Sequence, residues 1–178
     1  MYLHDTRQTL VMKRWGLTNL ARHPSQTVGL RLRVRTDADC ASLADLWVAS
    51  WREAMPDTDF PARRPWLLDH LRAIEAAGAI TICALDGSNR LLGFVTFDPA
   101  TAYLDQLAVA PEAKGTGAAK LLVAEARRLS PNGLVLDVNQ DNARALAFYE
   151  REGFAKIAEG VNPRSGLKTW QLRWPATA

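Results

Sequence analysis

The chain has 178 residues, of which 48% are hydrophobic and 23% are charged, a composition typical of one globular domain with a substantial core. The formal net charge of +3 is small and the longest Lys/Arg clusters are pairs such as Arg63-Arg64, so the composition argues against a nucleic-acid-binding protein. The sequence contains no run of about 18 apolar residues that would predict a transmembrane helix, and no apolar segment near residue 1 that would predict a secretory signal. We therefore expect a cytoplasmic protein without membrane contact.

The pattern of apolar residues predicts an α/β fold. Residues 1–29 show no clean period, and we expect them to form an extension in front of a domain over residues 30–178. In chain order we predict a strand over 30–35, helices over about 37–56 and 61–77, strands over 79–85, 91–98 and 102–109, a helix over 116–129, a strand over 134–138, a helix over 142–152, and strands over 154–158 and 167–173. This order gives an antiparallel first half and a β-α-β crossover in the second half.

The cysteines and histidines do not favour a metal site. Cys40 and Cys83 form no Cys-x-x-Cys pair, and the three histidines are scattered without the spacing of metal ligands. Cys83 lies in an apolar run, where we expect a small buried hydrophobic residue. We therefore expect no bound metal.

A glycine-rich segment follows the strand predicted over residues 102–109. Residues 114–119 read Lys-Gly-Thr-Gly-Ala-Ala and open an amphipathic helix. The first turn of a helix presents unpaired N–H groups and the positive end of its dipole, and small residues let a diphosphate approach the backbone. Lys114 and Lys120 flank the segment and add positive charge. The segment therefore predicts a phosphate-binding loop. The purely structural alternative is a tight strand-to-helix turn. The segment matches neither the Rossmann motif G-x-G-x-x-G nor the P-loop motif.

A second stretch, residues 136–154, contains another helix with polar and aromatic residues at regular positions. Taken alone it predicts a capped amphipathic helix, with Asn142 as the cap and Gly153 as the C-terminal stop. Together the two stretches resemble the GNAT superfamily of N-acetyltransferases. The family's phosphate loop, [RQ]-x-x-G-x-[GA], is matched over residues 114–119 with Lys in place of Arg or Gln. Its later motif, N-x-x-A-x-x-F-Y-x-x-x-G-F, is matched at Asn142, Ala145, Phe148, Tyr149, Gly153 and Phe154.

The resemblance, which covers residues 30–174, implies a fold and a cofactor site. The fold is a mixed central sheet of about seven strands, splayed in the middle, with about four flanking helices. Acetyl-CoA, as the acyl donor, would lie between the strands over residues 104–109 and 134–138. Its pantetheine would pair with the backbone of Leu107, Ala108 and Val109. Its pyrophosphate would bind Lys114, Gly115, Thr116, Gly117, Ala118, Ala119 and Lys120, while Asn142, Phe148 and Tyr149 would line the pantetheine arm and the sulfur.

Three side chains are candidates for the proton transfers of amine acetylation. The resemblance places Tyr149 at the departing thiolate as general acid, with a core tyrosine as the structural alternative. Asp105 and Asp137 compete for the role of base, and we favour Asp137 because it lies five residues before Asn142, as in the acetyltransferases of ribosomal-protein N-termini. A β-bulge in the strand over residues 104–109 would change which side chains face the cleft, so the choice between the two aspartates stays open.

The acceptor is the least determined part of the prediction. We expect a primary amine of a small molecule or of a protein N-terminus, which would meet the first two helices and their connection. Trp51, Glu53 and Asp57 are candidate contacts for a cationic amine, with core packing and solvated loop positions as the alternatives. A non-catalytic acyl-CoA-sensing module is the rival function, and a homodimer is compatible with either.

Overall fold

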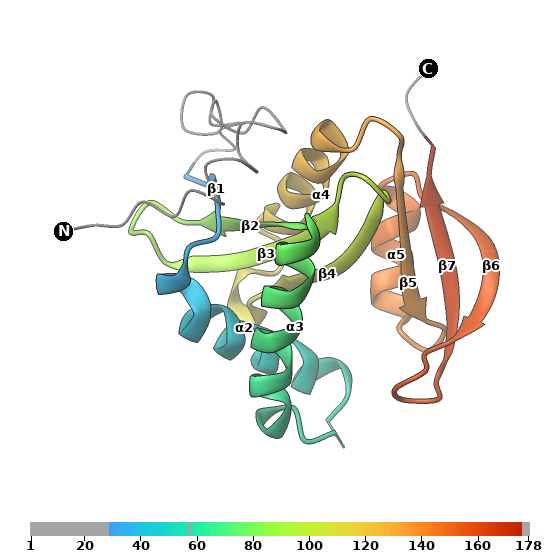
Figure 1. Cartoon of the computed structure of the whole chain (residues 1–178), viewed down its shortest axis with the longest axis horizontal. Coiled ribbons are helices and arrows are strands. Elements are labelled where there is room, and N and C mark those ends of the chain that lie inside the picture. The colour runs from blue at the N-terminus through green and yellow to red at the C-terminus, as the bar shows by residue number, and fades with distance from the viewer. Residues whose placement is uncertain (1–28, 57, 176–178) are drawn as a thin grey trace.

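Seven strands form one mixed sheet with helices packed on both faces (Figure 1). The structure, a computed structural model, describes residues 29–175 with the exception of residue 57. The strands are β1 (Arg31–Val34), β2 (Ile80–Leu85), β3 (Leu91–Asp98), β4 (Tyr103–Val109), β5 (Leu134–Asn139), β6 (Ala155–Val161) and β7 (Lys168–Trp174). The helices are α2 (Cys40–Ala54), α3 (Arg64–Ala77), α4 (Ala118–Leu129) and α5 (Ala143–Arg151), and the 3-10 turns are η2 (Asp37–Asp39), η3 (Pro61–Arg63) and η4 (Pro111–Ala113).

The predicted α/β fold, with about seven strands and four helices, is therefore confirmed. The predicted extension over residues 1–29 lies outside the described residues, apart from Gly29, and its separation from the domain stays a prediction.

The antiparallel half of the sheet forms a platform that is covered by helices on both faces. All six residues of β2 are buried, as expected from its apolar sequence, and β2 pairs with β1 and β3. Helix α2 packs on β3 and β4, whereas α4 packs on β2 and β3. Gly93 allows the close contact with α4, since a Cβ there would lie 3.2 Å from Leu122 Cδ1 and 2.8 Å from the Ala108 carbonyl oxygen.

The two parallel strands in the middle of the sheet touch at one end only. Tyr103 of β4 pairs with Val135 of β5, and Val135 N–H donates to the Ala102 carbonyl oxygen at 2.8 Å. Beyond this point β4 and β5 diverge (Figure 1). Residues of β4 past Tyr103 therefore keep their pairing with β3 while the opposite edge of the strand opens towards β5.

A β-bulge lies in β4 close to the point of divergence. Thr96 of β3 is opposite Gln106, and Phe97 is opposite Leu104, so that Asp105 is the extra, unpaired residue. A bulge bends its strand and changes the direction of the side chains around it. Sequence alternation along β4 alone does not reveal this change.

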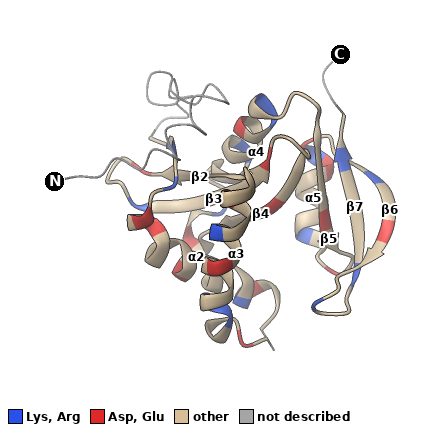
Figure 2. Cartoon of the chain, viewed as in Figure 1, with Lys and Arg blue, Asp and Glu red and all other residues tan. Residues whose placement is uncertain are grey.

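The second half of the sheet is closed by a β-hairpin. Strand β7 pairs antiparallel with β5, and β6 pairs with β7 at the edge, which gives the order β5-β7-β6. Helix α5 begins where the sequence predicts, because Asn142 Oδ1 accepts a hydrogen bond of 3.0 Å from Ala145 N–H. In Figure 2, Lys and Arg are interspersed with Asp and Glu over the elements in view. Within residues 29–56 and 58–175, no helix has the length and apolar character needed to span a membrane.

Candidate functional site

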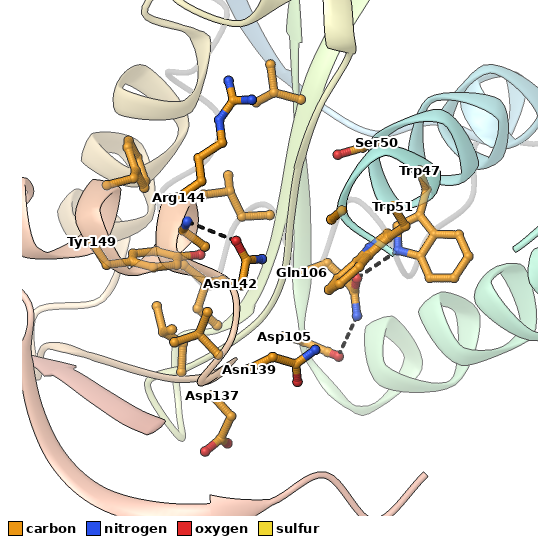
Figure 3. A pocket seen from close by; sticks show the side chains of 18 of the residues that line it. Trp47, Ser50, Trp51, Asp105, Gln106, Asp137, Asn139, Asn142, Arg144 and Tyr149 are labelled. Atoms are coloured by element: carbon orange, nitrogen blue, oxygen red, sulfur yellow. Dashed lines mark hydrogen bonds between the residues drawn. The ribbon is translucent and has the colours of Figure 1, made fainter. Parts of the chain in front are cut away.

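A cleft of about 810 Å³ opens where β4 and β5 diverge. One wall is formed by β5 and α5, and the other by β4, α2 and α3, while the start of α4 lies at one end. Figure 3 shows Tyr149 on one side of the cleft and Trp51 and Gln106 on the other. This volume lies in the range that is usual for ligand-binding sites.

The predicted phosphate loop lies at the end of this cleft. Gly115 and Gly117 have φ angles of 82° and 88°, in the left-handed region that favours glycine. A Cβ built on either residue has no described atom within 4 Å, so their backbone faces open space. Both glycines, with Lys114, Ala118, Ala119 and Lys120, line the cleft, whereas Thr116 does not and instead donates a hydrogen bond of 2.6 Å to the Ala113 carbonyl oxygen.

The first turn of α4 has unpaired backbone N–H groups that can bind an anion. Gly117 is the N-cap, where glycine offers no side chain to satisfy the turn. Leu121 N–H donates to the Gly117 carbonyl oxygen at 2.9 Å, and Ala118 N–H makes a contact of 3.4 Å with Thr116 Oγ1. Among the described residues, the N–H groups of Ala119 and Lys120 have no acceptor. Such N–H groups, next to two lysines, fit a diphosphate.

Strand β4 presents alternating residues to the cleft above this loop. Leu107 and Val109 line it, whereas the side chain of Ala108 is buried on the other face. The backbone edge of these residues that faces β5 has no partner strand there. It is the edge on which an extended ligand would add as a further strand.

Tyr149 lies on the opposite wall, in α5. Its ring is almost fully buried and makes edge-to-face contacts with Phe148 and Phe154, at 5.3 Å and 5.2 Å between ring centroids. Burial raises the pKa of Tyr149 above its ordinary value. The phenol is therefore a neutral donor throughout the physiological pH range. Asn142 and Phe148 line the same wall.

Asp105 and Gln106 both line the cleft, although neighbouring strand residues normally face opposite sides. The bulge at Asp105 explains this arrangement. Gln106 Oε1 accepts a hydrogen bond of 3.0 Å from Trp47 Nε1, and Asp105 contacts His70 of α3. The bulge thus directs the Asp105 carboxylate towards the helical wall of the cleft.

Asp137, the other candidate base, has a different environment. It is exposed, and its Oδ2 accepts a hydrogen bond of 2.9 Å from Tyr103 Oη. Partial burial and this hydrogen bond raise the pKa of Tyr103, so the phenol stays the donor. In Figure 3 the Asp137 side chain lies apart from the other labelled residues.

The predicted acceptor contacts fall in different places. Trp51 lines the cleft and stacks on Phe60, with 5.8 Å between ring centroids. Glu53 is exposed and forms ion pairs with Lys114 and, at 3.3 Å, with Arg144 of α5. Lys114 lowers the pKa of Glu53. Asp57 lies outside the described residues, so its role stays a prediction, as do the roles of the other site residues.

A model of the acetyltransferase (GNAT) family matches residues 40–154, which include the cleft and both motifs. The chain belongs to the GNAT acetyltransferase family. The matched residues include α2 through α5 and strands β2 to β5.

Curated relatives of the chain are acetyltransferases. The peptidyl-lysine N-acetyltransferase YiaC of Escherichia coli (strain K12) is 34% identical over 86 residues, which cover 48% of this chain and 58% of YiaC. Mycothiol acetyltransferase of Salinispora tropica is 33% identical over 140 residues, which cover 68% of this chain and 44% of the relative. The chain thus spans about half the length of these relatives.

A solved structure shares the fold. The PaiA N-acetyltransferase of Thermoplasma acidophilum, solved in complex with coenzyme A, superposes with a TM-score of 0.69 at 16% identity and covers 83% of this chain and 99% of its own. At such low identity the likeness concerns the fold alone.

Sequence reasoning missed several residues of the cleft. These are His70, Trp47, Trp66, Gln106, Asn139, Arg144 and Arg164. They come from α2, α3, β4, β5, α5 and the β6–β7 connection, and no short motif joins them. The spacing of Trp66 and His70 on one helix face carries some signal, since residues four apart in a helix are neighbours.

Proposed function

We propose that this chain transfers the acetyl group of acetyl-CoA to a primary amine, by direct attack within a ternary complex. The observation that carries the proposal is that two features share one cleft. The first turn of α4, with its unpaired N–H groups, lies at one end of the cleft, and Tyr149 lies in the wall formed by β5 and α5. A non-catalytic acyl-CoA-binding module needs only the first of these two features.

The donor half of the cleft fits a coenzyme A thioester. Residues 114–120 would hold the pyrophosphate through the N–H groups of Ala119 and Lys120 and the charges of Lys114 and Lys120. The free edge of β4 over Leu107–Val109 would hold the pantetheine amides, and Asn142 and Phe148 would line its other side. When bound, the thioester supplies an electrophilic carbonyl and a thiolate leaving group.

We assign Tyr149 the role of stabilising the leaving group. A thiol titrates near pH 8.5, whereas the pKa of the buried phenol lies above about 10. Complete proton transfer from Tyr149 to a thiolate is therefore uphill. We expect the phenol to donate a hydrogen bond to the sulfur as its charge develops, with solvent completing protonation after release.

The amine side of the reaction needs a residue that removes a proton. A primary alkylammonium titrates near pH 10.4, so reaching the neutral amine at pH 7 costs about 5 kcal/mol. The acceptor half is lined by aromatic side chains, including Trp51 and Phe60, that fit the aliphatic part and the positive charge of such an amine. Since YiaC is named a peptidyl-lysine N-acetyltransferase, we propose a lysine side chain in a peptide as the first acceptor to test, beside small amines and peptide N-termini.

The test is an acceptor screen with acetyl-CoA in which free thiol and acetylated amine are both measured. The panel contains a lysine peptide with a blocked N-terminus, a lysine-free peptide with a free N-terminus, and a small polyamine. We expect one class to be acetylated far faster than the others. Stabilisation by acetyl-CoA without turnover of any amine would instead favour the binding module.

A further inference from the structure

An imidazole and a carboxylate lie in direct contact on the acceptor side of the cleft. His70 Nε2 is 2.7 Å and 2.8 Å from the two oxygens of Asp105. Both side chains line the cleft, yet they are only 26% and 17% exposed. The pair is therefore partly shielded from water but open to a ligand.

Neighbouring residues fix this pair from both sides. Trp66, one helical turn before His70, stacks on the imidazole, with 4.9 Å between ring centroids and 20° between the planes. Asp105 is the bulged residue of β4, which turns its carboxylate towards α3. Gln106, anchored by Trp47, approaches the same carboxylate with its Nε2 at 3.5 Å. A carboxylate that orients an imidazole in this way fixes its tautomer.

The contact leaves one ring nitrogen of His70 available. A neutral ring that donates its Nε2–H to this carboxylate has a free lone pair on Nδ1. Among the described residues, every hydrogen bond of the ring is made by Nε2. An imidazole of this form, on a residue that lines a ligand cleft, has the features of a general base.

The geometry points to His70 as the residue that takes the proton from the acceptor amine, directly or through one water, with Asp105 as its positioning residue. This inference rests on the proposed acetyl transfer. The ammonium gives its proton to Nδ1, which leaves an imidazolium. The amine lone pair then forms the bond to the carbonyl carbon as the carbon–sulfur bond breaks. The new amide nitrogen loses its second proton to solvent, the departing thiolate takes one proton from solvent, and the imidazolium returns its proton to solvent. The net change is one amide, one coenzyme A thiol and one released proton.

An imidazole suits this step better than either aspartate acting alone. Carboxylates titrate near pH 4 and imidazoles near pH 6.5 in model compounds, so an imidazole is the better acceptor for a proton held near pH 10.4. Asp137 is engaged by Tyr103, whereas Asp105 is engaged by His70 itself. The inference therefore assigns Asp105 a supporting role and moves the base from β5 to α3.

Other titratable or charged groups line the same cleft and can also shape a pH profile. They include Asp137 with Tyr103 across the β4–β5 contact, Arg63 on η3, and Arg164 of the β6–β7 connection, whose guanidinium lies 3.6 Å from the Trp66 ring centroid. For this reason, the acidic limb of the profile, where kcat/KM falls at low pH, has to be assigned to a residue by comparing variants.

The experiment measures kcat/KM for the preferred amine across pH in wild type, His70→Gln, Asp105→Asn and Asp69→Asn. Asp69 is exposed on α3, pairs with Arg72 and lies outside the cleft, so its variant is the matched control and keeps the wild-type profile. We expect His70→Gln to lose about 10²–10⁴-fold in kcat/KM together with the acidic limb. Asp105→Asn should lose less and keep a limb at a changed pH. Added imidazole should restore part of the activity of His70→Ala.

The outcomes separate this inference from the proposed function. Transfer by wild type with an unchanged rate and acidic limb in His70→Gln would overturn the inference and leave acetyl transfer standing. Loss of activity in His70→Gln without loss of the limb, in a variant still stabilised by acetyl-CoA, would also overturn it. No transfer to any amine by wild type would overturn the proposed function, and the inference with it.

Discussion

Tyr149 combines an almost fully buried ring with a hydroxyl at the cleft, which makes it the most direct residue-scale test of the leaving-group chemistry. Tyr149→Phe keeps the ring contacts with Phe148 and Phe154 and removes only the donor. We expect kcat to fall about 10²-fold or more, as when one donor to a developing charge is lost, while the Kd for acetyl-CoA changes little. Because the pKa of Tyr149 is raised, its ionisation should not limit the wild-type rate below about pH 10.

Tyr103→Phe is the matched control, since it deletes a second phenol hydroxyl from the same cleft. That hydroxyl donates to Asp137, and we expect a much smaller effect on kcat. Equal losses in the two variants, measured by steady-state kinetics, would contradict the role given to Tyr149.

At the residue scale, the sequence predicted those parts of the site that lie in contiguous motifs. Asn142, Tyr149 and Gly117, which the motifs of the family resemblance singled out, all line the cleft. His70 was missed because its partner, Asp105, is 35 residues away and reaches it only through a bulge. Local sequence patterns do not predict such a tertiary contact.

The phosphate loop is an element-scale feature that depends on two left-handed glycines. Gly117→Ala adds a methyl group that points into open space at the N-terminus of α4. A left-handed non-glycine residue costs about 1 kcal/mol, so we expect a small loss of unfolding free energy and a several-fold higher Kd for acetyl-CoA. Gly78→Ala, at another positive φ but outside the cleft, should lose stability without a change in Kd. Calorimetric titration and denaturant unfolding measure both quantities, and equal Kd values in the two variants would contradict a phosphate cradle.

Glu53 links three elements, because its ion pairs join the end of α2 to the phosphate loop and to α5. In the proposed complex it competes with phosphate for Lys114. Glu53→Gln should therefore tighten acetyl-CoA binding by up to about 5-fold at low salt, as expected for a surface ion pair, and less at high salt. Glu112→Gln removes a nearby charge that pairs with Arg90 instead, and should change the Kd less. A higher KM for the amine with unchanged acetyl-CoA affinity would instead support the predicted acceptor contact of Glu53.

The junction of β1 and α2 has a pH-dependent contribution to stability. Asp39, 12% exposed, accepts two hydrogen bonds of 2.6 Å from Arg33, and this pairing lowers its pKa to about 2. A lowered carboxyl pKa stabilises the fold above the unfolded value near 3.9, and that stability is lost as the pH falls towards 2. We expect the unfolding free energy of wild type, measured in urea, to drop by about 2 kcal/mol more than that of Asp39→Asn between pH 5 and about 2. The exposed Asp37→Asn should follow wild type, and a drop of equal size in Asp39→Asn would contradict the assignment.

The elements themselves were largely predictable, but their arrangement was less so. Hairpin turns and apolar alternation located β1 to β4, and the glycine stops located the ends of α3 and α5. The insertion of β7 between β5 and β6 was not predicted, because period and turn signals identify a pair of strands without saying which one faces the sheet. The sequence raised a bulge in β4 as one possibility but did not predict the bulge at Asp105, because one extra residue in a strand does not change the local composition.

At the scale of the whole molecule, the proposed function requires the two halves of the sheet to act together. The platform of β1 to β4 carries the phosphate loop, Asp105 and, through α3, His70, whereas Tyr149 belongs to the C-terminal half. Within the described residues, β4 and β5, the adjoining strands of the two halves, pair only at Tyr103–Val135, and the cleft opens beside this pair. A ligand that binds across the cleft should therefore stabilise both halves against unfolding.

The most direct test of acetyl transfer is its stoichiometry. Wild-type protein is mixed with acetyl-CoA and the best amine of the screen, and free thiol and acetylated amine are quantified in the same samples by absorbance and mass spectrometry. We expect the two products to appear one for one, at a rate that rises with both substrates and falls strongly in Tyr149→Phe. Thiol release without acetylated amine, or no product from any amine at saturating acetyl-CoA, would contradict this expectation.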